Sequence, residues 1–208
     1  MTTNITPAII TAPRPGKFYL TRSLNSYFKV WDTIPAVFAE PNSRKDIRIT
    51  DWFESSIRLG IEDNWRRAAE WCVGQGRKYS LLMEDDIEWH TKAPVDLRTF
   101  MQGSNIPSGF ISPYCSSLNA PRQNGWACPS KVNNWCGCLA LLFRTEQLKI
   151  ILDHEITPPL DLGLGHVCRD LGLDILTHRP TLVKHIGTTS CNQKVNREVY
   201  LKGRLPCL

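Results

Sequence analysis

The sequence predicts a single α/β domain with a mixed, mainly parallel sheet flanked by helices. Residues 79–83 form a short apolar run that no polar face interrupts, which is typical of a strand buried on both sides. A helical pattern precedes this run, and a helix that leads into a buried strand favours parallel pairing. With 208 residues, 42% of them hydrophobic and 22% charged, the chain is long enough for one core and ordinary for a globular protein.

The N-terminal part divides into a lead-in and the start of the domain. Residues 1–16 contain three prolines and many threonines, so we expect an extended lead-in, with the domain over 17–208. Residues 17–22 have the composition of a first strand, and Ser23 is a suitable N-cap for a helix running to about Trp31. A strand followed by a helix start would place Arg22 near a nucleotide.

The pattern from about residue 51 to 73 is helical. Its apolar residues recur at spacings of three or four: Ile57, Ile61, Trp65, Ala68 and Cys72. Glycines end this helix before the strand at 79–83. Residues 36–39, held between two prolines, are a plausible second strand.

The second half of the chain continues the alternation of strands and helices. The expected strands cover 109–114, 138–143 and 174–177. The expected helices cover 95–101, opened by Pro94, 146–153, capped by Thr145, and 166–171.

Three consecutive carboxylates, Glu84, Asp85 and Asp86, end the buried strand at 79–83. Like charges this close raise one another's pKa unless a cation is present. Carboxylate oxygens suit Mg²⁺ or Mn²⁺, and ligands bind at the carboxyl ends of strands in α/β sheets. The alternative is a solvated acidic turn without a ligand.

Residues 116–135 form the longest irregular segment. A loop of this length inside a compact domain is usually functional or disordered, and its tryptophans argue against disorder. Trp126 and Trp135 are therefore candidates for seating a sugar or a base, with burial against the core as the alternative.

The global properties limit the choice of partner only loosely. A net charge of +5 and a pI of about 8.8 fit an anionic ligand such as a nucleoside diphosphate, or DNA. No signal peptide and no stretch of about 18 apolar residues is present, so we expect a cytoplasmic protein without a membrane segment. The eight cysteines contain no C-x-x-C pair, which favours reduced thiols over a zinc site.

Three pieces occur in a specific order: Glu84-Asp85-Asp86 after a strand, Gly137 before the strand that leads to Arg144-Thr145-Glu146, and a run from Arg179-Pro180 to His185-Ile186-Gly187 and Ser190. Over residues 17–192 this order resembles nucleotide-sugar glycosyltransferases of the GT-A fold. It is most similar to the N-acetylglucosaminyltransferase IV family and to short bacterial and phage glycosyltransferases. A phage origin would place the protein in the host cytoplasm.

The resemblance implies a metal-binding role for two residues and a donor-binding role for several more. Asp86 and His185 would bind Mn²⁺ (or Mg²⁺), which suits a carboxylate–imidazole pair and would bridge the donor's phosphates. Without the resemblance, His185 would be read as a structural histidine. The donor-binding candidates are Arg22, Glu84, Asp85, Gly187, Ser190 and Lys194, with Lys184 as a further cation near the phosphates.

An inverting transfer needs a general base at the acceptor hydroxyl. Asp161, expected just before a helix, matches the position of an acidic residue in similar enzymes, although it would serve equally well as an N-cap. Asp170 is the second candidate for this base.

The expected function is therefore metal-dependent transfer of a sugar from a nucleotide sugar, by default a UDP-sugar, to a hydroxyl acceptor with inversion. The acceptor would be a modified DNA base, as for some phage enzymes, or a glycan. One rival is a metal-dependent nucleotidyltransferase, which would be expected to carry a glycine-rich phosphate loop that is missing here. The other is a nucleic-acid-binding module without catalytic activity, which leaves the acidic triplet unexplained.

Overall fold

The structure is a computed structural model of the 208-residue chain. It describes residues 4–14, 16–102, 108–116, 121, 123–128, 135 and 137–187.

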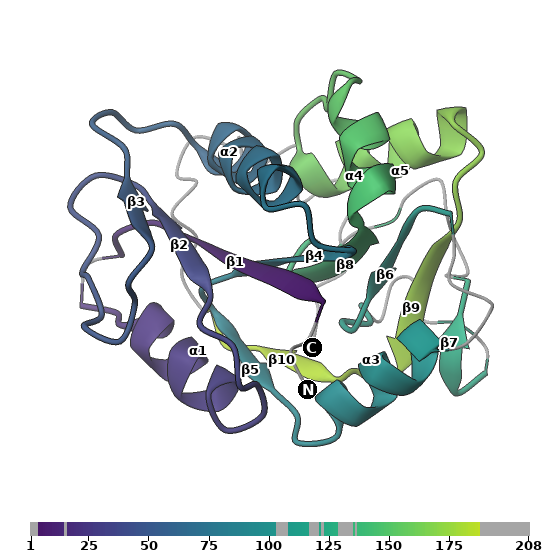
Figure 1. The fold of residues 1–208 in the computed structure, drawn as a ribbon, viewed down its shortest axis with the longest axis horizontal. Helices are drawn as coiled ribbons and strands as arrows, with labels where there is room; N and C mark the ends of the chain where they lie inside the picture. Colours follow the sequence, from purple (N-terminus) through teal and green to yellow (C-terminus); the bar gives the residue numbers. More distant parts are fainter. Residues whose placement is uncertain are drawn as a thin grey trace, which may run out of the picture.

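One mixed sheet forms the centre of the molecule, in the order β3-β2-β1-β4-β8-β6-β9-β7 (Figure 1). Its strands are β1 (Ile5–Thr11), β2 (Ala36–Ala39), β3 (Trp52–Glu54), β4 (Tyr79–Glu84), β6 (Phe110–Ser112), β7 (Gly125–Ala127), β8 (Ala140–Arg144) and β9 (Ile175–Arg179). The helices are α1 (Tyr19–Tyr27), α2 (Ile61–Gly74), α3 (Ala93–Gln102), α4 (Thr145–Leu152) and α5 (Leu160–Asp170). The pairings β3-β2-β1-β4 and β6-β9 are parallel, and β8 and β7 run antiparallel to their neighbours. The predicted α/β class with a mixed, mainly parallel sheet is confirmed.

Helices cover both faces of this sheet (Figure 1). On one face α2, α4 and α5 pack against the core that contains Leu82, Trp65 and Val167. On the other face α1 and α3 cover a second core that contains Leu24, Leu81 and Met83. Successive residues of β4 therefore enter opposite cores, which is why its sequence is apolar throughout.

Strand β1 is an inner strand of the sheet, between β2 and β4. The prediction that residues 1–16 are a lead-in outside the domain was wrong, because Ile5–Thr11 is buried throughout. The pairing of β1 with β2 begins at Ala8, just after Pro7, so the missing N–H of Pro7 lies outside that ladder. The predicted strand over 17–22 was also wrong, since Tyr19 already begins α1.

The predicted helix over 51–73 begins later than expected, at Ile61. Its first part forms strand β3, and Ile57 is exposed instead of inward-facing. Trp65, Ala68 and Cys72 do form the buried stripe, so the prediction fails only over residues 51–60.

The helix boundaries after β8 also differ from the prediction. Thr145 is the first residue of α4 instead of its cap, and its hydroxyl shares a 2.9 Å hydrogen bond with the Ser80 hydroxyl in β4. The last predicted helix, over 166–171, begins earlier, at Leu160. Asp161 therefore lies inside the first turn of α5, and Pro159 occupies the N-cap position.

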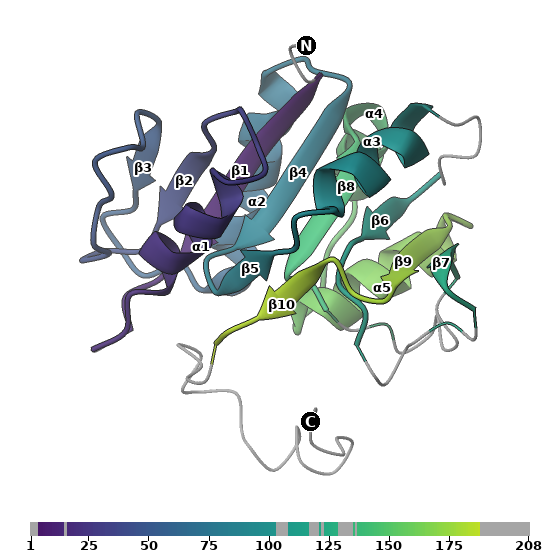
Figure 2. The ribbon, with the colours of Figure 1, turned by 90° about the horizontal axis from the view of Figure 1, so that it is seen from below.

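A separate two-stranded ribbon crosses below the main sheet (Figure 2). It pairs β5 (Ile87–Trp89) antiparallel with β10 (Val183–His185), with His185 opposite Ile87. Helix α1 packs on β5. This ribbon joins the residues just after the acidic triplet to a segment about a hundred residues later in the chain.

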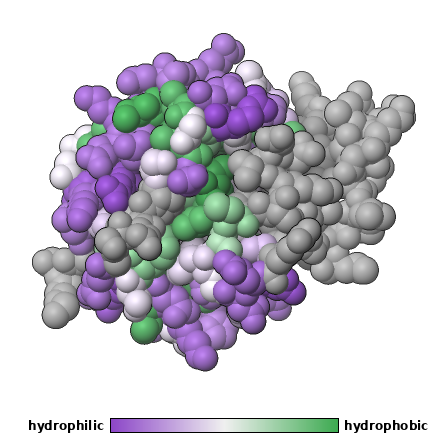
Figure 3. All heavy atoms as spheres, turned by 90° about the vertical axis from the view of Figure 1, so that its right-hand side faces the viewer, coloured by the Kyte–Doolittle hydropathy of each residue, from purple (hydrophilic) through white to green (hydrophobic). Residues whose placement is uncertain are grey.

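The surface is mixed in character. The face on the right-hand side of Figure 1 is hydrophilic over much of its described area, with a hydrophobic strip through its middle (Figure 3). Within the described residues, no helix is long and apolar enough to cross a membrane.

Candidate active site

The acidic triplet lies where β4 ends, beside the carboxyl ends of β1 and β2. Glu84 is the last residue of β4 and pairs with Ile10 near the end of β1. Thr11 at the end of β1 pairs with Ala39 at the end of β2. Three parallel strands thus bring their carboxyl ends together, which is the edge of an α/β sheet where ligands bind.

Asp85 is buried and held by two residues that follow from β1. The Thr11 hydroxyl and an Arg14 guanidinium N–H each donate a hydrogen bond to its carboxylate, both at 2.5 Å. Burial raises the pKa of Asp85 above its ordinary value, and the Arg14 charge opposes this shift. Asp85 is therefore fixed in place by its partners.

Asp86 forms a pair with His185. Its Oδ2 lies 3.2 Å from His185 Nε2 and 3.4 Å from the Arg14 guanidinium. The carboxylate is 6% exposed and the imidazole 43% exposed, so the pair opens to solvent on the histidine side. The backbone N–H of Ile186 also donates to the backbone carbonyl of Asp86 at 2.8 Å, which locks β10 onto this corner.

Gly187 allows this close approach. A Cβ placed on Gly187 would lie 2.1 Å from Asp86 Oδ2 and 2.7 Å from His185 Nε2. A side chain here would displace the Asp86–His185 pair from its observed position, whereas glycine leaves the pair in place.

Glu84 faces the side of the sheet covered by α2, α4 and α5, as does Leu82 two residues earlier. Burial, then the charges of Asp86 and Asp85, raise the pKa of Glu84 to about 8. The charge of Asp161 raises it further, which places the first turn of α5 electrostatically within reach of the triplet. The Asp161 carboxylate also accepts a hydrogen bond from the backbone N–H of Leu162 at 3.0 Å.

A pocket opens at the ends of β1, β2 and β4. Its polar lining comprises Thr11, Arg14, Glu40, Arg58, Asn64, Glu84 and Asp85. Arg14 and Arg58 give it two cations, which suits an anionic ligand.

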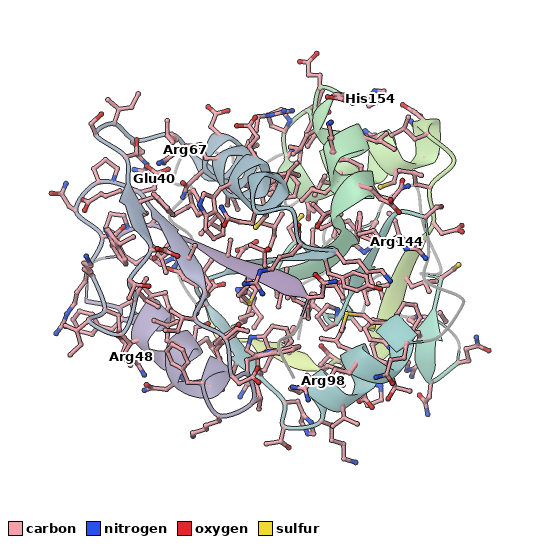
Figure 4. All side chains as sticks on the ribbon, viewed as in Figure 1. Glu40, Arg48, Arg67, Arg98, Arg144 and His154 are labelled. Atoms are coloured by element: carbon pink, nitrogen blue, oxygen red, sulfur yellow. The ribbon has the colours of Figure 1, made fainter. Side chains whose placement is uncertain are left out.

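Glu40 shapes this pocket without offering a free carboxylate. It follows β2 and lies on the side of β2 that faces α2 (Figure 4). Its oxygens accept hydrogen bonds from the backbone N–H groups of Leu59 and Gly60, each at 2.9 Å. Gly60 has φ of +86°, a conformation that favours glycine. Glu40 thus holds the segment that carries Arg58 to the pocket.

The structure brings together most of the predicted metal-site and donor-site residues. Glu84, Asp85, Asp86, His185 and Gly187 all meet at one corner. Ser190 and Lys194 lie outside the described residues.

Two of the predicted cations lie away from the pocket. Arg22 is on α1, 56% exposed, with its guanidinium 2.6 Å from Glu88. Like Asp86 and His185, it is not among the residues that line the pocket, and none of its described contacts is with the acidic triplet. Lys184 pairs with Glu88 in the ribbon. Because it directly precedes His185 in β10, its side chain points to the opposite face of the ribbon. Neither position supports the predicted donor contact.

The two predicted acceptor tryptophans are packed. Trp135 is 1% exposed and lies edge-on to Phe110 at 4.9 Å, so the prediction that its ring is presented to an acceptor was wrong. Trp126 is half-buried between Phe100 and His178, with ring centroids at 5.0 and 4.8 Å. An acceptor contact for Trp126 stays a prediction.

Asp170, the second candidate for the base, lies at the far end of α5 from Asp161. It is the last residue of α5, exposed and paired with Arg169 at 2.8 Å. At 1.5 Å per residue it lies about 13 Å along the helix from Asp161. Of the two candidates, only Asp161 is among the charges that act on Glu84.

The sequence analysis did not identify four of the polar pocket residues: Thr11, Arg14, Glu40 and Asn64. Thr11 and Arg14 could have been found from the apolar run over residues 8–10, because that run predicts a strand that ends just before them. Glu40 follows a predicted strand and was open to the same argument.

Solved structures resemble this chain in fold, although their sequence identity to it is low. No protein-family model matches the chain, and no curated protein matches it by sequence. Among solved structures, S. aureus TarS residues 1–349 aligns with a TM-score of 0.60 and 12% identity, covering 86% of this chain and 59% of that one. The fold is GT-A.

Two further GT-A structures align over most of the chain. GalNAc-T7 with UDP, GalNAc and Mn²⁺ has a TM-score of 0.60 at 9% identity, covering 90% of this chain and 45% of that one. The mannosyltransferase PcManGT from Pyrobaculum calidifontis, with GDP-Man and Mn²⁺, has a TM-score of 0.59 at 10% identity, covering 90% and 58%. The chain thus spans about half the length of these proteins, and identity this low establishes the fold alone.

Proposed function

We propose that this protein is a glycosyltransferase that moves a sugar from a nucleotide sugar, by default a UDP-sugar, to a hydroxyl acceptor with inversion. The observation that carries the proposal is the Asp86–His185 pair at the end of β4, beside a pocket with two arginines, in a GT-A fold. Three of the structures that it resembles contain a nucleotide sugar or a nucleotide: TarS 1–349 with UDP-GlcNAc, GalNAc-T7 with UDP and PcManGT with GDP-Man, the last two with Mn²⁺.

The residues present fit a divalent metal ion. Asp86 Oδ1 is buried and has no hydrogen-bond partner among the described residues, so the carboxylate keeps an unused acceptor at the site. A carboxylate and an imidazole together suit Mn²⁺, and two protein ligands leave positions for phosphate oxygens. No group of three or more candidate ligands gathers in the described part of the chain. A cation held by Asp86 and His185 supplies stabilisation of the negative charge on a leaving diphosphate.

The chain's own cations support the same role. Arg14 and Arg58 line the pocket at the ends of β1 and before α2, where they are placed to bind an anionic donor. Glu40 fixes the Arg58 segment through backbone N–H groups. Donor contacts from Gly187 through its backbone, and from Ser190 and Lys194, complete the proposed donor side.

Asp161 is the proposed general base. It lies in the first turn of α5 and acts electrostatically on Glu84, so it is near the triplet without being part of it. A base in this position would accept the proton of the acceptor hydroxyl while the donor lies against the β4 end. The acceptor itself, a glycan or a modified DNA base, would approach from this side.

A donor panel tests the proposal directly. The protein is incubated with Mn²⁺ and a set of nucleotide sugars, and release of nucleoside diphosphate is measured together with protection against thermal unfolding. Asp86→Ala should lose both the release and the metal-dependent protection while keeping its fold. Near-normal turnover of Asp86→Ala in EDTA would refute the metal assignment. Release of pyrophosphate from a nucleoside triphosphate would favour a nucleotidyltransferase instead.

Acceptor assays then separate the two acceptor classes. Once a donor is identified, transfer is measured to oligosaccharides and to DNA containing hydroxymethylated bases. Salt-dependent DNA binding that persists in Asp86→Ala without any transfer would favour the nucleic-acid-binding alternative.

A further inference from the structure

Arg14 occupies an unusual position beside the proposed metal site. It follows β1, its side chain is 8% exposed, and it contacts both Asp85 and Asp86. A buried arginine between two carboxylates satisfies charges that would otherwise repel one another. A donor-binding role for Arg14 does not by itself explain why its guanidinium also contacts Asp86.

The two contacts of Arg14 differ in strength. One guanidinium N–H lies 2.5 Å from Asp85, and the other lies 3.4 Å from Asp86 Oδ2. Asp85 is also held by the Thr11 hydroxyl, so this end of the interaction is fixed. The long contact to Asp86 is the weaker one, and it is directed at the same oxygen that faces His185.

We propose that Arg14 is an internal counter-ion that occupies Asp86 before the metal binds, and so makes metal binding depend on the donor diphosphate. This inference rests on the proposed function, since it assumes that Asp86 is a metal ligand. Anchored on Asp85, the guanidinium would release its long contact with Asp86 Oδ2, the oxygen that faces His185, when Asp86 binds the metal.

The pocket explains how the donor enters this coupling. Arg14 lines the pocket that would receive the anionic donor, so a diphosphate offers it a new partner. Binding of the diphosphate would draw the guanidinium away from Asp86 and leave that carboxylate to the metal. When the binding of two ligands is coupled in this way, each must raise the protein's affinity for the other by the same factor.

Mn²⁺ binding by calorimetry, with and without UDP, tests the role of Arg14. Wild type should bind Mn²⁺ weakly alone and much more tightly with UDP. Arg14→Gln, which removes the competing charge, should bind Mn²⁺ alone about 10- to 100-fold more tightly than wild type. The factor by which UDP tightens Mn²⁺ binding should shrink correspondingly in the variant.

Arg22→Gln is the matched control, because Arg22 is also paired with a carboxylate but lies away from the pocket. It should leave both affinities at their wild-type values. If Arg14→Gln does not fold, Arg14→Lys serves, since a lysine cannot bridge two carboxylates as the guanidinium does. It should tighten Mn²⁺ binding in the same direction by a smaller factor.

The outcomes separate the two proposals. Unchanged or weaker Mn²⁺ binding in the Arg14 variants, with binding in wild type abolished by Asp86→Ala, would overturn the counter-ion role alone. Mn²⁺ binding that is insensitive to Asp86→Ala would instead overturn the metal site, and the counter-ion role with it.

Discussion

Gly187 offers the sharpest test of the metal site, because its replacement changes geometry without changing any ligand. In Gly187→Ala the new Cβ would meet Asp86 Oδ2 at 2.1 Å and His185 Nε2 at 2.7 Å, whereas real Cβ contacts essentially never fall under 3.0 Å. The carboxylate oxygen must therefore move by about 1 Å, taking 3.0 minus 2.1 Å.

A shift of that size exceeds what a metal site tolerates. Ligand distances in protein metal sites hold to within about 0.2 Å, and a misplacement of about 1 Å costs roughly 10²-fold in rate. We therefore expect Gly187→Ala to lower Mn²⁺-dependent transfer by about two orders of magnitude. The fold should persist, because the backbone bond between Ile186 and Asp86 does not involve the new methyl group.

Calorimetric Mn²⁺ titration in the presence of UDP and a thermal unfolding scan without ligands measure these two effects separately. Gly74→Ala is the matched control, since a Cβ at Gly74 meets nothing within 4 Å. It ends helix α2, where alanine is favoured over glycine. Wild-type Mn²⁺ affinity in Gly187→Ala would refute the reasoning, because it would mean that Asp86 and His185 do not hold the ion.

Three other substitutions test single groups of the site. His185→Ala should weaken UDP binding only when Mn²⁺ is present, and an equal loss without the metal would indicate a structural role. Glu84→Gln removes a carboxyl group whose pKa is raised from 4.5 to about 8 in the folded protein. Because the unfolded chain loses this proton at a lower pH, metal-free wild type should lose stability relative to the variant as the pH rises between those values. Parallel dependence of the unfolding free energy on pH in the two proteins, measured by urea unfolding, would contradict this. Asp161→Asn should slow transfer about 10²–10⁴-fold with donor affinity unchanged, and a collapse of donor binding would place Asp161 in the donor site.

The sequence predicted the centre of the site because its signal there is local. The apolar run of β4 and the three carboxylates at its end are adjacent in the chain, so the strand and the candidate ligands could be predicted together. Cys72 and Trp65 similarly lie on one helix stripe that needs no tertiary information. These features follow from periodicity and charge alone.

The sequence failed where a residue's role depends on a distant partner. Pro7 made β1 resemble a lead-in, and only its pairing with β4 on one side and, from Ala8, β2 on the other shows why the proline is tolerated. With β1 missed, Arg14 could not be placed beside Asp85. Trp135 was read as a loop residue, but its contact with Phe110 determines that it is core.

The position of His185 depends on the β5–β10 ribbon, which no local pattern indicates. Side chains alternate along β10, so His185 shares the face of Val183, which is buried, while Lys184 points to the opposite face with Glu88. His185 is the last residue of β10 and is partly exposed, and its Nε2 lies 3.2 Å from Asp86 Oδ2. A shift of the ribbon by one residue would exchange His185 and Lys184 and place an ammonium group against the carboxylate. The register of three residue pairs therefore places His185, and not Lys184, beside Asp86 at the proposed metal site, and Gly187 leaves room for the pair.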